Sequence, residues 1–199
     1  MKNLIEAVAL IFSNDDWFNK VLVGGFYTCC VLLVFPIIMI NGFMVEYMRT
    51  VIHGSHVLPY WRNATSIIKT GWKVSLALIL YYAAATLLLH LAGYDVISIQ
   101  TAILYFILHT TLHPIVLLAY VKKERFLTCL NILLLLRIVL LNWKELLPVL
   151  FISAALLLAA ILLGWMWIIV GWPLLVFLTL LIQNTMVALT LRPHFFSQS

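Results

Sequence analysis

Residues 146–191 read LLPVLFISAALLLAAILLGWMWIIVGWPLLVFLTLLIQNTMVALTL, and none of them carries a charged side chain. A run of roughly 20 apolar residues crosses the hydrocarbon core of a bilayer, so this stretch is long enough to cross twice. The segment at 164–171 interrupts it with two glycines and two tryptophans, which predicts an external turn at the headgroup level. The stretch therefore predicts a membrane hairpin with spans at about 146–163 and 173–191.

The composition of the whole chain supports the same interpretation. The chain has 199 residues, of which 65% are hydrophobic and only 10% charged, and its mean hydropathy is +1.12. Soluble domains carry about a quarter charged residues. The net charge of +5 would suggest a nucleic-acid partner in a soluble protein, but here the basic residues gather in loops between apolar runs. Orientation in a membrane explains that pattern better, so the predicted partner is the lipid bilayer and not nucleic acid.

Three more apolar runs predict transmembrane helices, at about 20–40, 74–92 and 99–120. Two shorter runs, at about 4–12 and 126–141, predict interfacial amphipathic helices. The second of them contains Arg137, and a charged residue at the membrane centre costs at least ~2.5 kcal/mol. The sequence therefore predicts one all-α domain over 1–199, a polytopic transmembrane helical bundle with about five spans.

The first of these spans has a proline near its end. Pro36 removes a backbone donor and predicts a kink. The helix is expected to continue beyond the span through Ile52 and to stop at Gly54.

The distribution of positive charge predicts how the chain is oriented. Lys and Arg outnumber acidic residues in the loops at 41–73 and 122–145, whereas the turn at 93–95 has no positive charge. Cytoplasmic loops carry the excess of positive residues. We therefore expect a multi-pass protein of the cell membrane, plasma or inner, with the N-terminus outside and the C-terminus in the cytoplasm.

Several short motifs resemble a known family. The chain has FSNDDWFNKVLVGG at 12–25, followed by the motif positions Tyr47, Arg49, Gly54, Leu58-Pro59-Tyr60-Trp61 and Gly71, and then by Gly171-Trp172-Pro173 and Gln183 in the last span. These positions resemble the bacterial and archaeal membrane family catalogued as domain of unknown function 4013. In that family an acidic residue usually follows the motif proline, whereas this chain has Tyr60 at that position. The resemblance implies the membrane architecture and carries no established activity.

Two histidines in the third span are candidates for cofactor binding. His109 and His113 are one helical turn apart, a spacing that zinc-binding helices use. A metal site needs further ligands, and the hydrocarbon part of the predicted spans contains no carboxylate. Neutral packing histidines are therefore favoured over haem or metal ligation, and we expect no metal and no cofactor. Pro114 leaves the carbonyl of Thr110 without its helical donor, so Thr110, Thr111 or His113 is expected to help satisfy the freed backbone.

Gln183 and Asn184 are the polar exceptions near the middle of the last span. Interhelical hydrogen bonding explains such residues at least as well as a polar pathway does. Both interpretations stay open at this point.

The Leu58-Pro59-Tyr60-Trp61-Arg62 segment predicts a structural anchor at a membrane interface. An indole suits the headgroup layer, and a guanidinium suits lipid phosphate. The candidates for interface or lipid anchoring are Trp17, Arg49, Leu58, Pro59, Trp61 and Arg62. Binding of an anionic lipid or of another subunit is the functional alternative for the same residues.

Two functions from different classes follow from these observations. The sequence has no Ser-His-acid, paired-carboxylate, phosphate-loop or zinc signature, so an enzyme is not expected. The first hypothesis is an accessory or structural subunit of a larger membrane complex, packed against other membrane proteins. The alternative is a component of a small-solute or ion transporter or channel, for which Gln183, Asn184, His109 and His113 would form the polar path.

Overall fold

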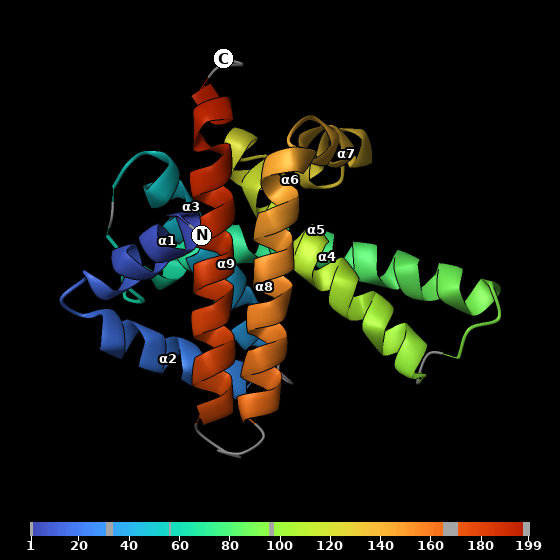
Figure 1. The fold of residues 1–199 in the computed structure, drawn as a ribbon, viewed down its shortest axis with the longest axis horizontal. Coiled ribbons are helices and arrows are strands. Elements are labelled where there is room, and N and C mark those ends of the chain that lie inside the picture. The colour runs from blue at the N-terminus through green and yellow to red at the C-terminus, as the bar shows by residue number, and fades with distance from the viewer. Residues whose placement is uncertain (1, 31–33, 56, 96–97, 165–170, 197–199) are drawn as a thin grey trace.

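The computed structural model describes residues 2–30, 34–55, 57–95, 98–164 and 171–196, and every regular element within them is an α-helix. The helices are α1 (Lys2–Phe12), α2 (Trp17–Cys29), α3 (Val34–Ile52), α4 (Ala64–Leu91), α5 (Ile99–Lys123), α6 (Phe126–Cys129), α7 (Ile132–Leu141), α8 (Trp143–Gly164) and α9 (Gly171–Phe196). Figure 1 shows α8 and α9 as an upright pair at the centre of the molecule. The turn expected at 164–171 falls on residues 165–170, which lie outside the described residues.

Five of these helices, α3, α4, α5, α8 and α9, are long and apolar enough to cross a membrane. They match the predicted number of spans, and α4, α5, α8 and α9 overlap four of the predicted ranges. The segment at 126–141 forms the two short helices α6 and α7, neither of which reaches the length of a span. The chain is therefore an all-α, multi-pass membrane protein.

The first span differs from the expectation of one helix over 20–40. The structure has two helices there, because α2 ends at Cys29 and α3 begins at Val34. At 1.5 Å per residue α2 is only about 20 Å long, too short to cross the hydrocarbon core. Pro36 falls in the first turn of α3, where backbone N–H groups have no helical partner, so it starts a helix instead of kinking one. The expected end is confirmed, since α3 stops at Ile52 and Gly54 has φ +80°.

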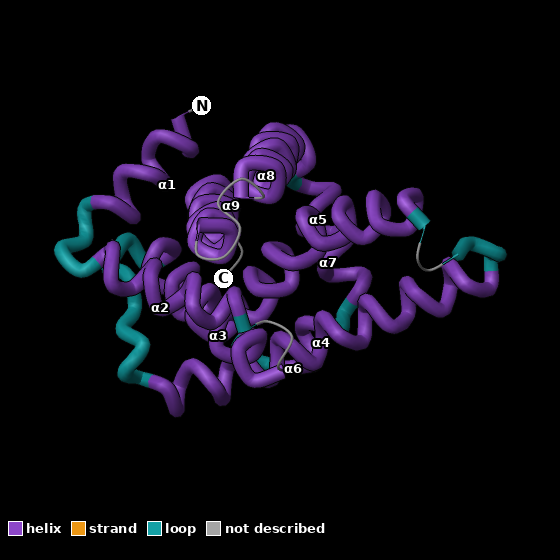
Figure 2. Tube along the Cα trace, turned by 90° about the horizontal axis from the view of Figure 1, so that it is seen from below, coloured by secondary structure: helices purple, strands orange, loops and turns teal. Residues whose placement is uncertain are grey.

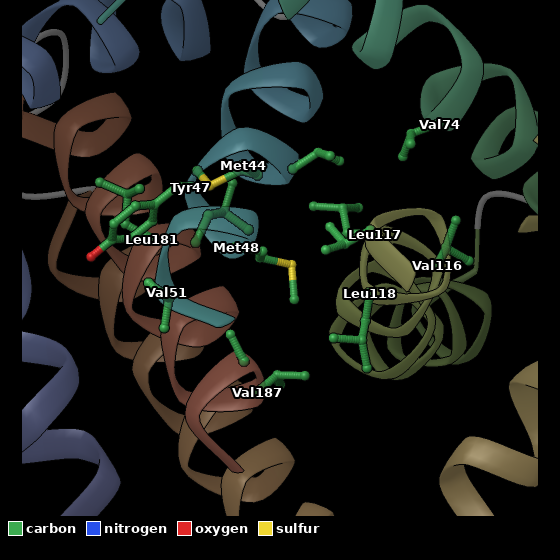
Figure 3. Close-up of a cluster of buried hydrophobic side chains, with 14 of the residues drawn as sticks. Met44, Tyr47, Met48, Val51, Val74, Val116, Leu117, Leu118, Leu181 and Val187 are labelled. Atoms are coloured by element: carbon green, nitrogen blue, oxygen red, sulfur yellow. The ribbon is translucent and has the colours of Figure 1, made fainter. Parts of the chain in front are cut away.

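The core forms around α3, whose residues are mostly buried. Figure 3 shows Met44 and Met48 of α3 between Leu117 of α5 and Leu181 of α9. These side chains have at most 1% of their surface exposed. Close packing of these four apolar side chains holds the three helices together by van der Waals contact, which is the main attraction available between helices in lipid.

Two glycines bring the backbones of α3 and α4 into contact. A Cβ atom at Gly71 would lie 1.9 Å from the carbonyl oxygen of Ile38, and a Cβ atom at Gly42 would lie 2.0 Å from that of Ile67. Only glycine fits at both positions. Helices α3 and α4 therefore cross where these two glycines meet, and Asn41 is the residue before Gly42.

Helices α4 and α5 form an arm that leaves the bundle. Figure 2 shows α8 and α9 end-on, whereas α4 and α5 are seen along their length and point away. Large hydrophobic side chains along the outer part of the arm are exposed, among them Ile79, Leu87, Leu88, Leu91, Ile99, Ile103 and Ile107. In a membrane protein such a surface faces lipid or another transmembrane helix.

The short N-terminal helix α1 packs against α9. Ala7 and Ile11 are fully buried, and the Asn3 side-chain amide donates a 2.8 Å hydrogen bond to Thr190 Oγ1 on α9. One face of α1 is thus covered by protein. The interfacial position expected for α1 and for α6 and α7 stays a prediction.

The three cysteines differ in exposure, and this predicts different reactivity. Cys29 is exposed and Cys30 is half-buried, whereas Cys129 in α6 is fully buried and burial raises the pKa of its thiol to about 12. The thiolate is the reactive form. We expect a maleimide at neutral pH to modify Cys29 in the detergent-solubilised protein and to leave Cys129 unmodified until SDS unfolds the chain. Peptide mass mapping checks this, and equal rates at Cys29 and Cys129 would contradict the packing of α6.

Candidate functional site

The two candidate histidines lie side by side on α5 within the bundle. The ring centroids of His109 and His113 are 4.9 Å apart and the rings are stacked. Nδ1 of His109 lies 2.8 Å from the hydroxyl of Tyr82 on α4. His113 is almost completely buried, with 3% of its surface exposed. The structure thus brings together the two histidines that the sequence singled out.

A second hydrogen-bonded group links His113 to two further helices, and the stacked histidine rings join it to the Tyr82–His109 pair. Asn41 of α3 donates through Nδ2 to Ser75 Oγ of α4, at 2.9 Å. Its Oδ1 lies 3.0 Å from Nε2 of His113. Because the amide nitrogen faces Ser75, the amide oxygen accepts a hydrogen bond from His113. We call Asn41, Ser75, Tyr82, His109 and His113 the polar chain.

Sequence reasoning missed Asn41 and Ser75. The available signal was their spacing from glycine, since Asn41 precedes Gly42 and Ser75 follows Gly71 by one helical turn. Small residues on facing helices allow close approach, and a polar residue beside them then lies within hydrogen-bonding reach of the partner helix.

The polar chain forms part of the wall of a cavity. The cavity has a volume of about 310 Å³ and lies between α2, α3, α4, α5 and α9. Apart from the five residues of the polar chain its lining residues are Thr28, Ile37, Ile40, Leu78, Ile79, Trp172, Val176 and Leu180. Outside the polar chain the wall is therefore apolar except for Thr28, whose hydroxyl donates to the Gly24 carbonyl.

Gln183 holds α9 to α5. Its side-chain amide donates a 2.8 Å hydrogen bond to the carbonyl of Thr110, the carbonyl that Pro114 leaves without a helical donor. The Thr110 and Thr111 hydroxyls instead bond to carbonyls of residues 106–108, so the expectation that they or His113 satisfy this group is corrected. Asn184 is fully buried and its amide bonds to the carbonyl of Leu180 in its own helix.

The segment around Trp61 is tied to α2 and α3. The indole stacks on Phe43 with ring centroids 4.2 Å apart, and its Nε1 donates a 2.9 Å hydrogen bond to the carbonyl of Lys20. The Leu58 N–H donates to Asn14 Oδ1 at 2.9 Å, and the Leu58 carbonyl accepts from Lys20 Nζ at 2.8 Å. The predicted anchor therefore has internal partners, whereas a role at the lipid interface stays a prediction.

Lys20 is a charged group in this cluster. Its side chain is nearly buried, and its Nζ also lies 4.0 Å from the centre of the Tyr60 ring. Burial lowers the pKa of Lys20, an effect that the nearby Asp16 carboxylate opposes. The ammonium group compensates part of its lost hydration through the Leu58 carbonyl and the aromatic face.

The other candidates for interface anchoring are Arg49, Trp17, Arg62 and Pro59, and each has its own surroundings. Arg49 bridges two acids, with Nη1 2.6 Å from Glu46 and Nη2 2.8 Å from Glu124. It therefore links α3 to the end of α5. Trp17 packs edge-on against Phe12 at 4.4 Å, while Arg62 is exposed. Pro59 precedes the exposed Tyr60 and is itself half-buried.

Within the described residues there is no group of three or more His, Cys, Asp or Glu side chains placed to hold a metal ion. His109 and His113 have Tyr82 and Asn41 as their side-chain partners instead.

Comparison with known proteins places the chain in a family. A family model described as "Protein of unknown function (DUF4013)" matches residues 26–171, more than half of the chain. The matched part includes the motif positions from Tyr47 to Gly71, whereas the opening motif at 12–25 and Gln183 lie outside it. No curated protein and no solved structure matches the chain. The chain therefore belongs to the DUF4013 family.

Proposed function

We propose that this protein is a non-enzymatic accessory subunit of a larger membrane complex, in which the arm formed by α4 and α5 receives a transmembrane helix of the partner. The proposal places it in the cell membrane, with its N-terminus outside and its C-terminus in the cytoplasm. The excess of Lys and Arg where α3 ends and α4 begins, and over residues 122–145, supports that orientation.

The observation that carries the proposal is an apolar groove along the arm. We call it the arm groove. It has a volume of about 440 Å³ and lies between α4, α5 and α7. Its lining includes the small residues Ala84 and Ala85 and the larger Leu88 and Leu136. Small residues in a groove let a second helix approach closely, and larger apolar residues beside them give it a ridge to pack on.

The polar side chains of the bundle support a structural role. Gln183 satisfies the Thr110 carbonyl, Lys20 satisfies the Leu58 carbonyl, and Arg49 is paired with two acids. These groups hold the chain's own helices in place. The exposed surface of the arm, by contrast, offers apolar contact area, which is what a helix of another subunit needs.

Site-specific photo-crosslinking in native membranes tests the proposal. A benzophenone amino acid is placed at Leu88, which lines the arm groove, or at Phe151 on α8 as the matched control, since both side chains are exposed and apolar. We expect a discrete protein adduct from position 88 and none from position 151. The same protein should copurify in fixed stoichiometry in mild detergent.

Two results would contradict the accessory role. Adducts with lipid alone at both positions would overturn the accessory role. A pure chain that carries an ion or solute across liposome membranes would favour the transporter alternative, with the polar chain as its path.

A further inference from the structure

We propose that the side of α7 that faces away from the bundle binds the headgroup of an anionic phospholipid, and that the Arg137 guanidinium donates hydrogen bonds to the lipid phosphate. This side carries Leu133, Arg137 and Leu140, and we call it the α7 face. None of the three residues lines the arm groove, so the proposal does not depend on the accessory role.

The neighbours of α7 in the chain place it at a membrane surface. Helix α5 ends at Lys123 and α8 begins at Trp143, and both helices are long and apolar enough to cross a membrane. The 10 residues of α7 extend only about 15 Å, which is too short to cross the hydrocarbon core. Figure 1 shows α7 beside the first turns of α8, at the same end of the molecule as the C-terminus. The segment between the two spans therefore begins and ends on one side of the membrane, and α7 lies on that side.

The two sides of α7 differ in their surroundings. Leu135 packs into the core with 4% of its surface exposed, whereas Leu133 and Leu140 are 80% and 67% exposed. Arg137 is four residues after Leu133 and three before Leu140, a spacing that puts all three on one side of a helix. Leucines on both sides of a cation suit the boundary of the bilayer, because they enter the hydrocarbon while the arginine reaches the headgroups.

Arg137 has no partner of its own in the protein. It is half-buried, yet within the described residues its guanidinium makes no ion pair and no hydrogen bond. The helix that presents it is already capped, since Asn131 Oδ1 accepts a 3.0 Å hydrogen bond from the Leu134 N–H. A guanidinium binds phosphate oxygens through two parallel hydrogen bonds. A lipid phosphate would therefore supply the partner that the protein does not.

The charge around α7 favours a lipid with a net negative charge. Residues 122–145 include five Lys and Arg against two Glu, and Glu124 is paired with Arg49. The exposed cations beside α7 in the chain are Lys123, Arg125 and Lys144. Basic groups close to a membrane surface attract anionic headgroups, whereas the choline cation of a zwitterionic lipid is repelled by them.

Titration of the full-length protein with two matched lipids tests the proposal. The probes are dioleoyl phosphatidylglycerol and dioleoyl phosphatidylcholine, which share acyl chains and phosphate and differ in net charge. Native mass spectrometry in detergent measures the affinity for the first lipid bound. We expect the parent to bind phosphatidylglycerol at least about tenfold more tightly than phosphatidylcholine, and Arg137→Gln to lose about tenfold, since charge-assisted hydrogen bonds are at stake. Arg137→Lys keeps the charge without the paired donors, so its affinity should be intermediate.

A crosslink at Leu133 tests the same face with Arg137 intact. A benzophenone amino acid at this exposed position should form adducts with phospholipid in native membranes and none with protein. Arg137→Gln should melt like the parent in phosphatidylcholine nanodiscs, because the guanidinium has no internal partner. If Arg137→Gln fails to fold, Arg137→Lys and the crosslink at Leu133 decide the outcome.

Three results would overturn the proposal. Equal affinity of the parent for the two lipids would show that the anionic headgroup is not recognised. Unchanged affinity of Arg137→Gln for phosphatidylglycerol would show that the site lies elsewhere. A discrete protein adduct at Leu133 would make the α7 face a subunit interface. The adducts expected at Leu88 are independent of all three, so the accessory role is tested separately.

Discussion

Replacing Gly71 with alanine is expected to destabilise the protein by about 3 kcal/mol, the upper end of the range for overpacked sites. The new Cβ atom would lie 1.9 Å from the Ile38 carbonyl oxygen and 2.8 Å from the Gly42 nitrogen, and real contacts of this kind do not fall below 3.0 Å. Both obstacles are backbone atoms, so no side chain can rotate away. The helices α3 and α4 must separate instead.

The separation would also weaken the polar chain. Ser75 lies one helical turn beyond Gly71, and Asn41 is next to Gly42, so the 2.9 Å bond between their side chains depends on the same close approach. Loss of that bond would leave buried polar groups without partners. Overpacking and loss of hydrogen bonding therefore act in the same direction.

Thermal unfolding in detergent, followed by size-exclusion chromatography, measures the effect. Ala83→Leu is the matched control, because it adds a larger group to an exposed position of the same helix. We expect the control to melt like the parent and Gly71→Ala to melt well below it. Equal melting temperatures for all three would mean that α3 and α4 are not in backbone contact.

The hydrophobic pattern predicted the number of long apolar helices, because the thickness of a bilayer imposes a length on each apolar run. It failed at 20–40, where one apolar stretch forms α2 and α3. Periodicity and hydropathy are the same for a continuous helix and for two helices with a break. The position of Pro36 was the available signal, since proline is favoured in the first turn of a helix.

The candidate site was predicted in part. The sequence identified His109 and His113 and the backbone carbonyl that Pro114 leaves free. It did not identify Gln183 as the donor to that carbonyl, nor Asn41 and Ser75 as partners on facing helices. Each of these contacts joins residues at least 34 positions apart. Such pairs depend on how the helices pack, which a local pattern does not specify.

Replacing Trp61 with alanine is expected to cost about 3 kcal/mol, near the lower end for removal of a large aromatic side chain because the indole is only half-buried. The change removes the stacking on Phe43 and the hydrogen bond to the Lys20 carbonyl. Both contacts join the segment after α3 to the bundle. We therefore expect a lower melting temperature and a lower yield of folded protein in membranes.

Two further variants separate the contributions at this position. Trp61→Phe keeps an aromatic ring against Phe43 and loses the Nε1 donor, so it should cost only about 1 kcal/mol, the value of one hydrogen bond. Arg62→Ala changes the exposed neighbour and should leave the melting temperature unchanged. Unfolding measurements on the purified variants check both expectations.

The same set of variants decides what the Leu58–Arg62 segment does. If Trp61 is an internal anchor, Trp61→Ala loses folded protein and Trp61→Phe largely restores it, because the Phe43 contact is what the ring supplies. If the segment instead recognises an anionic lipid or a partner, Trp61→Ala folds normally, and Arg62→Ala loses binding to vesicles containing phosphatidylglycerol or loses the copurifying subunit. Stacking at 4.2 Å within the bundle favours the first result, since an indole so placed is already in contact with protein.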